Sequence, residues 1–283
     1  MEIGSAHSQL RFGTGECRVP VAVFPDPGVL GQALAGEILA QVERARGEGR
    51  SYLLGCPAGR SLRSTYVALA ELAAARGTDL SHLVIAMMDE YLATAPGGHR
   101  LCPADVHYSC RGYGRREILD PINEGLPPDR RIPQENLWYP EPENAMAYDG
   151  RLRAAGGVDL FLVASGASDG HVAFNPVGTA LAERTRVIRL SMATRRDNLE
   201  TFPDFGSLEE LPEFGVGVGL GTIVEYSRRV VLVITGRGKR DAALRLHRCA
   251  DFTSAWPASF IYRCQNPMIL LDRFASSLVE NAS

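Results

Sequence analysis

The stretch SYLLGCPAGRSLRSTYVALAELAAARGTDLSHLVIAMM (51–88) decides the fold class. Its apolar runs at 51–56 and 83–88 predict two strands, and the segment between them, 62–76, predicts a helix. Runs as uniformly apolar as these are typical of strands that are buried on both faces of a sheet. A strand, a helix and a strand in succession therefore indicate an α/β fold with a mostly parallel sheet covered by helices.

The same alternation continues outward along the chain. A helix is predicted over 28–46, where aliphatic residues recur about every three or four positions. The Pro- and Gly-rich region from about 95 to 145 predicts connections, with one or two helices around HYSCRGYGRREIL (107–119). Nothing in the sequence divides the chain, so we expect a single α/β domain over residues 1–283. Further strands are predicted at 19–24, 160–165, 186–191, 230–235 and 268–272.

Composition narrows the class of protein. The chain has 283 residues, 45% of them hydrophobic, which is enough for a large core. Its formal net charge of −3 gives no bulk attraction to nucleic acid or to a membrane surface. No apolar run approaches the roughly 20 residues that span a bilayer, and the first residues show no signal peptide. The six cysteines form no C-x-x-C pair, so we expect reduced thiols, no metal site and a cytoplasmic location.

Ligands bind beyond the carboxyl ends of the strands in a sheet of this kind, so the residues after each apolar run matter most. Pro57, Gly59 and Ser61 follow the strand at 51–56. Glycine lets the backbone approach an anion, serine offers a hydroxyl, and the start of a helix offers unpaired N–H groups. This loop suits an anion site, although a plain turn and helix cap would use the same residues.

Two other strands are followed by ionisable residues. Asp89 and Glu90 come after 83–88, where a partly desolvated carboxylate can abstract a proton; a helix cap or a solvated pair is the alternative. Asp169 and His171 flank a glycine after 160–165. An aspartate that accepts a hydrogen bond from a histidine fixes its tautomer and lets it transfer protons near neutral pH. A structural histidine at a turn remains the alternative.

The fourth such loop, after 230–235, contains Lys239. This residue is the only lysine among the 30 Lys and Arg residues of the chain. A cation in the first turn of a helix opposes the helix dipole, which an anionic ligand at that helix end would explain. By itself the position could equally be chance.

Taken together and in this order, these loops resemble the glucosamine-6-phosphate deaminase/isomerase family, whose relatives include 6-phosphogluconolactonases. The sequence DEY followed by DGHVAFN resembles the deaminase branch more than the lactonases. The resemblance implies a Rossmann-like three-layer sandwich, no metal or organic cofactor, and a homo-oligomer. The matching stretches are LGCPAGRSLRSTYVAL (54–69), MMDEY (87–91), SDGHVAFN (168–175), LAERTR (181–186), GVGVGLGTI (215–223) and TGRGK (235–239).

The resemblance also implies roles for individual residues. Asp89 corresponds to the carboxylate that moves a proton between C1 and C2 of the sugar. His171, held by Asp169, corresponds to the residue that assists opening of the sugar ring. Gly59, Ser61 and Lys239 correspond to positions that bind the substrate phosphate.

Two departures from the family pattern affect this site. Pro176 stands where the deaminases have a glutamate, so we expect His171 to keep a single carboxylate partner. Glu200, in TRRDNLETF (194–202), aligns with a phosphate-binding arginine and would repel a phosphate. Arg60, or alternatively Arg195 or Arg196, is expected to supply the missing positive charge.

Three functions fit these residues. The leading hypothesis is an isomerase or deaminase that acts on a sugar phosphate or a related anionic sugar, with a changed substrate. A sugar lactone hydrolase, in which His171 activates water, is the second. A non-catalytic sugar-phosphate sensor is the third, disfavoured because Asp89, Asp169 and His171 are all present.

Overall fold

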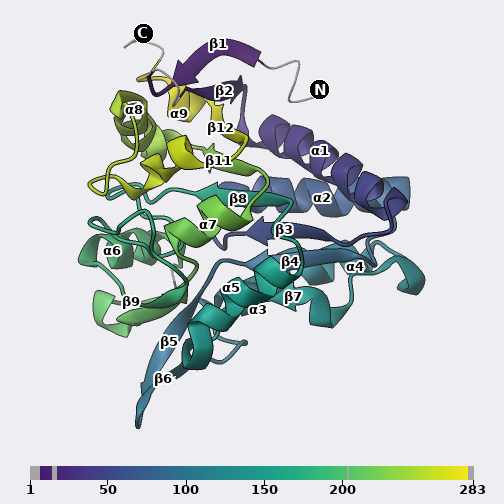
Figure 1. The fold of residues 1–283 in the computed structure, drawn as a ribbon, viewed down its shortest axis with the longest axis horizontal. Coiled ribbons are helices and arrows are strands. Elements are labelled where there is room, and N and C mark those ends of the chain that lie inside the picture. Colours follow the sequence, from purple (N-terminus) through teal and green to yellow (C-terminus); the bar gives the residue numbers. More distant parts are fainter. Residues whose placement is uncertain (1–6, 15–17, 203, 280–283) are drawn as a thin grey trace.

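The computed structural model describes residues 7–14, 18–202 and 204–279. An eight-stranded sheet runs through this part of the chain, in the order β1-β2-β12-β11-β8-β3-β4-β7 (Figure 1). β1 pairs antiparallel with β2, and every other neighbouring pair in this sheet is parallel. The mostly parallel sheet predicted from the apolar runs is therefore confirmed. The strands are β1 (His7–Phe12), β2 (Val19–Phe24), β3 (Tyr52–Cys56), β4 (Leu83–Met87), β7 (Leu137–Trp138), β8 (Leu160–Ala164), β11 (Val230–Ile234) and β12 (Pro267–Asp272).

Helices cover both faces of this sheet and complete a three-layer sandwich. On one face, α1 (Pro27–Gly47), α2 (Arg63–Arg76) and α4 (Asp120–Glu124) share a buried apolar cluster with the sheet. On the other, α5 (Ala145–Ala154), α7 (Leu220–Tyr226) and α8 (Arg240–Arg248) share a second cluster. Three further α-helices among the described residues are α3 (Cys110–Tyr113), α6 (Met192–Thr201) and α9 (Arg273–Ser276).

A second, four-stranded antiparallel sheet was not predicted. Its order is β6-β5-β10-β9, and Figure 1 shows the β5–β6 hairpin projecting from the body of the molecule. The strand expected at 186–191 belongs here and not in the parallel sheet, because its charged ends leave it only partly buried. The region expected to hold only connections and helices contributes the end of β5, β6 and β7. The strands are β5 (Asp89–Ala95), β6 (Gly98–Leu101), β9 (Arg186–Arg189) and β10 (Phe214–Gly217).

The chain passes from one sheet to the other at Met88. Its backbone N–H donates to the carbonyl of Cys56 in β3, and its carbonyl accepts from the N–H of Val218, just after β10. Asp89 is consequently the first residue of a strand and not part of a loop. This crossing fixes the carboxylate at the junction of the two sheets.

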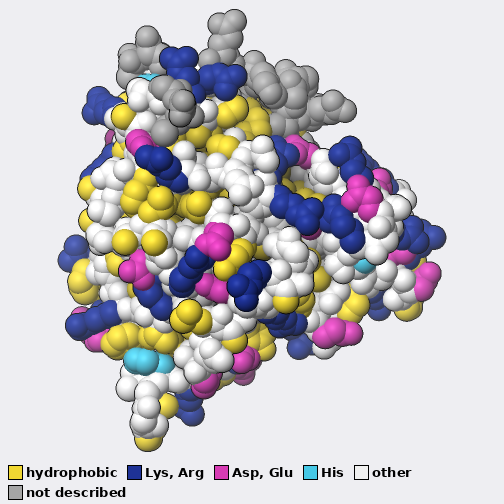
Figure 2. Space-filling view, in the orientation of Figure 1, with side chains coloured by type: hydrophobic (Ala, Val, Ile, Leu, Met, Phe, Trp, Pro, Cys, Tyr) yellow, Lys and Arg dark blue, Asp and Glu magenta, His cyan; other side chains and the backbone are white. Residues whose placement is uncertain are grey.

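The outer surface carries charges of both signs. Figure 2 shows basic and acidic side chains interspersed over the visible face, in keeping with the small net charge. Within the described ranges, no helix combines the length and apolar character needed to cross a membrane. Five cysteines are described, all as free thiols, and Cys17 lies outside the described residues.

Candidate active site

A cavity of about 110 Å³ opens at the carboxyl ends of β3, β4, β8 and β11. Six of the seven residues predicted from the sequence line it. The seventh, Asp169, contacts the ring of His171. Residues from segments far apart in the sequence thus meet in one place, at the carboxyl ends of the parallel strands. The six are Gly59, Arg60, Ser61, Asp89, His171 and Lys239.

Asp89 is buried, with 7% of its surface exposed. Burial raises the pKa of Asp89 to about 7; the thiol of Cys110 and the ring of His171 pull it down, and the charge of Glu90 pushes it up. A carboxylate in this range can take up and release a proton at neutral pH, which is what an acid–base catalyst requires.

Glu90 holds the surroundings of Asp89 in place. Its fully buried carboxylate accepts hydrogen bonds from the Ser109 hydroxyl at 2.7 Å and from the N–H groups of Tyr91, Cys110 and Arg111 at 2.8, 2.8 and 2.9 Å. These contacts join β5 to the start of α3. Asp89 and Glu90 were both candidate carboxylates from their position after 83–88, and the contacts of Glu90 make it a residue that supports the site.

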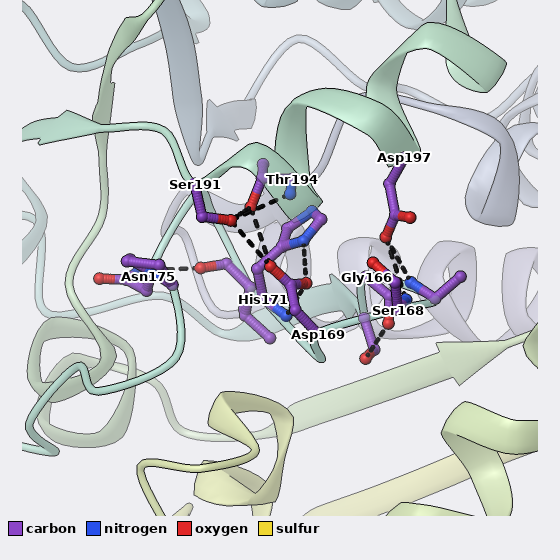
Figure 3. Close-up of polar contacts among 12 residues, drawn as sticks. Gly166, Ser168, Asp169, His171, Asn175, Ser191, Thr194 and Asp197 are labelled. Carbon is purple, nitrogen blue, oxygen red and sulfur yellow. Dashed lines mark hydrogen bonds and ion pairs between the residues drawn. The ribbon is translucent and has the colours of Figure 1, made fainter.

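His171 is oriented by Asp169 (Figure 3). The ring Nδ1 lies 2.6 Å from Asp169 Oδ1, while Asp169 Oδ2 accepts from the hydroxyls of Ser191 and Thr194, both at 3.1 Å. Burial alone would raise the pKa of Asp169, but the hydrogen bond and charge of His171 lower it below its usual range. An ionised Asp169 assigns the ring proton to Nδ1, so Nε2 is the nitrogen free to accept or deliver a proton.

Backbone geometry beside the histidine leaves no room for a side chain at Gly166. A Cβ there would lie 2.2 Å from His171 Nδ1 and 2.7 Å from Asp169 Oδ1. After the histidine, Ala173 and Phe174 adopt φ angles of +48° and +65°, which cost energy for residues other than glycine. The side-chain amide of Asn175 stabilises this turn by donating to the carbonyls of Val172 and Val218, each at 2.8 Å.

Lys239 also lines the cavity and is partly buried. Its ammonium donates a hydrogen bond to the carbonyl of Ser165. Burial lowers the pKa of Lys239 to about 8; Asp197 opposes this shift and Arg60 adds to it. The predicted anion loop lies near by, where Gly59 has a φ of 101° that favours glycine.

Asp197 is a cavity residue that the sequence did not single out. It lies on α6, and its carboxylate accepts from the N–H groups of Ala167 and Ser168 at 2.9 and 3.2 Å (Figure 3). The available signal was its place one helical turn before Glu200, which the sequence had already related to the site. Among the described residues, Asp169 is the only carboxylate hydrogen-bonded to His171, as Pro176 had implied. Asp197 nonetheless brings a second carboxylate within 4.8 Å of that pair.

Asp169, His171 and Asp197 also form the one group among the described residues whose spacing could hold a metal ion. The structure gives each of them another partner: Asp169 is bonded to His171, Ser191 and Thr194, and Asp197 to two backbone amides. The arrangement is accounted for by hydrogen bonding within the protein.

The arginines expected to offset Glu200 behave differently from one another. Arg60 forms an ion pair with Glu200 at 3.5 Å, with both side chains mostly exposed. Arg195 is buried and donates instead to the carbonyls of Leu208 and Leu211, so it cannot serve the cavity. Arg196 is exposed and is not among the cavity residues. The expectation for Arg195 and Arg196 is therefore wrong, because α6 turns both away from the cavity.

Comparison with known proteins places this site in context. No family model matches the chain. The chain is 34% identical over 262 residues to the glucosamine-6-phosphate deaminase of Streptomyces avermitilis, and the match covers 93% of each protein. A solved structure described as a monomeric glucosamine-6-phosphate deaminase has a TM-score of 0.76 at 24% identity, covering 91% of this chain and 99% of its own.

A 6-phosphogluconolactonase from Trypanosoma cruzi shares the fold, with a TM-score of 0.63 at 17% identity over 91% of this chain and 95% of its own. These two structures establish the Rossmann-like architecture, while the first relative matches nearly the full length in sequence as well. The chain belongs to the glucosamine-6-phosphate deaminase family of enzymes.

Proposed function

We propose that this enzyme moves a proton between C1 and C2 of an amino sugar or sugar phosphate, as an isomerase or deaminase whose substrate differs from that of its relatives. The observation that carries the proposal is the meeting of Asp89, His171 and Lys239 in one cavity. A base with a pKa near 7, an oriented imidazole and a cation together suit enolisation of a sugar.

Ring opening comes first in this mechanism. Nε2 of His171 accepts the proton of the anomeric hydroxyl and returns a proton to the ring oxygen as the C1–O5 bond breaks. Asp169 stabilises the imidazolium that forms between these two transfers, and it keeps Nδ1 as the donor. The product of this step is the open-chain aldehyde.

Asp89 then removes the proton from C2. The electron pair of the C2–H bond forms a C1=C2 double bond while the π electrons of the C1=O bond move to O1, which takes up a proton released by the hydroxyl or ammonium group on C2. Asp89 then returns its proton to C1, and a lone pair of the group on C2 forms the new double bond to that carbon. With a hydroxyl at C2 the product is the ketose. With an amino group at C2 the product is an iminium ion, which water hydrolyses to the ketose and ammonia.

A panel of hexosamines, hexoses and their phosphates, incubated in D₂O, tests the proposal. Deuterium uptake at C2, ketose formation and ammonia release are followed separately, because uptake without ammonia identifies a simple isomerase. Asp89→Asn should abolish uptake and leave sugar binding largely intact, while the exposed control Asp129→Asn should behave as the parent.

Other results would redirect the assignment. Turnover of gluconolactones alone would select the lactone hydrolase, a chemistry that His171 could serve by activating water. Binding of sugar phosphates with no exchange at all would select the sensor. Undiminished exchange in Asp89→Asn would refute the assignment of the base.

The proposal extends to the setting of the enzyme. We infer that it works in the cytoplasm, as a homo-oligomer and with neither metal nor organic cofactor. The free thiols of the described cysteines support the location, and the resemblance of the loops to the family supports the other two inferences. Light scattering of the purified chain measures the number of subunits. Activity that survives dialysis against a chelator would agree with chemistry carried by Asp89 and His171 alone.

A further inference from the structure

The charged side chains of the cavity leave no net positive charge for an anion. Its cations at neutral pH are Arg60 and Lys239, and α6 places the carboxylates of Asp197 and Glu200 in the same cavity. Asp89 adds a third carboxylate, whose pKa of about 7 leaves it partly ionised at neutral pH. The cations are thus already matched by carboxylates before any substrate enters.

Each cation also has a partner within the protein. Arg60 forms an ion pair with Glu200 at 3.5 Å. The ammonium of Lys239 donates a hydrogen bond to the carbonyl of Ser165, and the negative charge of Asp197 favours its protonated form. Asp197 is held in position by two backbone amides, so it cannot easily move away from an incoming anion. Glu200 is more exposed, but its displacement by a phosphate would cost the pair with Arg60.

A phosphate ester carries a charge between −1.5 and −2 at neutral pH and is bound by groups with excess positive charge. Like charges placed against each other disfavour binding and give specificity against the wrong ligand. A sugar hydroxyl has the opposite preference, since carboxylates accept its hydrogen bond. The uncharged side chains of Ser61, Asn198 and Thr201 also line this cavity and suit hydroxyl groups.

We propose that the substrate is an unphosphorylated hexosamine, whose free terminal hydroxyl lies at the α6 side of the cavity, where Glu200 and Asp197 exclude a phosphate. This inference rests on the proposed C1–C2 proton transfer and names its substrate class. Glu200 acts as a specificity-determining residue, and Arg60 serves as its partner and not as a phosphate clamp.

The experiment compares glucosamine with glucosamine 6-phosphate as substrates of the full-length enzyme, followed by ammonia release and deuterium uptake at C2. We expect kcat/KM to be at least about 10-fold higher for glucosamine. Inorganic phosphate should not inhibit competitively at millimolar concentrations. Glu200→Gln frees Arg60 and should shift the preference toward the phosphate by about 10-fold.

The matched control is Glu213→Gln, which removes an exposed ion pair of similar length, 3.6 Å to Arg189, outside the cavity. Its substrate preference should equal that of the parent. Equal or preferential use of glucosamine 6-phosphate by the parent would overturn the inference and leave the proposed chemistry standing. Absence of turnover with both sugars and with the rest of the panel would overturn the proposed function, and the substrate class with it.

Discussion

Two groups in the cavity have pKa values displaced toward each other, and they set the expected pH dependence. Asp89 must be ionised to remove a proton, and its pKa is raised to about 7 by burial. Activity should therefore rise with pH through about 7. Lys239 must be protonated to balance the carboxylates, and its pKa is lowered to about 8, so activity should fall as pH rises through about 8.

The profile of kcat/KM against pH should accordingly be a narrow bell with its maximum between those two values. Lys239→Arg keeps the positive charge at every accessible pH and should remove the alkaline limb. An unchanged alkaline limb in that variant would show that another group is responsible. An acidic limb near 4 would mean that Asp89 is not the base.

Asp169 supports a second prediction at the residue scale. Asp169→Asn removes the charge that fixes the proton on Nδ1 of His171, and the amide can hold the ring in the wrong tautomer. We expect kcat to fall by about 100-fold or more, with a smaller change in KM. Circular dichroism serves as the check on folding. A loss of less than tenfold would assign His171 a structural role.

At the scale of elements, the loop between β8 and His171 depends on the absence of a side chain at Gly166. Gly166→Ala would force the imidazole and the Asp169 carboxylate to move, because the new Cβ would lie within 2.2 Å of Nδ1. We expect a loss of activity of about 100-fold and a destabilisation of about 1 to 3 kcal/mol, measured by turnover and chemical denaturation.

The matched control is Gly150→Ala in α5, where a Cβ meets nothing within 4 Å. Alanine should be neutral or stabilising there by up to about 1 kcal/mol, since it favours the helix. Full activity in Gly166→Ala would contradict the tight packing on which the orientation of His171 depends.

The strands of the parallel sheet could be predicted from the sequence, whereas the antiparallel sheet could not. The parallel strands were found because runs such as 51–56 and 230–235 are apolar over nearly their whole length, and their loops could then be placed at one edge. The antiparallel sheet was missed for a local reason. β5 starts with two acidic residues directly after Met88, and β10 is the glycine-rich FGVG, so neither has the pattern of a strand.

Site residues could be predicted where they stand together in one short sequence motif. They could not be predicted where their role depends on contacts made only in the folded chain. Asp169 and His171 stand two residues apart in one loop. Asp197 and Glu90 gain their roles from segments that only the folded chain brings near. The roles of Arg195 and Arg196 were misjudged because sequence proximity to Glu200 does not say which side of α6 faces the cavity.

At the scale of the whole molecule, the two apolar clusters share one central sheet, and we expect the chain to unfold as a single domain. The two tryptophans report on different elements: Trp138 lies in the edge strand β7, and Trp256 is buried beside Gly170. Trp138→Phe leaves Trp256 as the one fluorescent tryptophan, and Trp256→Phe leaves Trp138. Fluorescence and circular dichroism should give the same midpoint within each variant.

Separate midpoints for the two probes within a variant would indicate that the region around the remaining tryptophan unfolds independently of the rest of the chain. The cavity lies at the ends of β3, β4, β8 and β11. If one part of the sheet unfolded independently, sugar binding would be lost at a different denaturant concentration from the unfolding of the whole chain.

The most direct test of the central claim is a crystal structure with the open-chain analogue 2-amino-2-deoxyglucitol bound. Three side chains from separate segments of the chain should touch one sugar: the Asp89 carboxylate within about 3.5 Å of C1 and C2, His171 Nε2 at an oxygen that takes part in ring opening, and Lys239 on the same molecule. An analogue bound elsewhere, or bound in the cavity with Asp89 beyond reach of both carbons, would contradict the account.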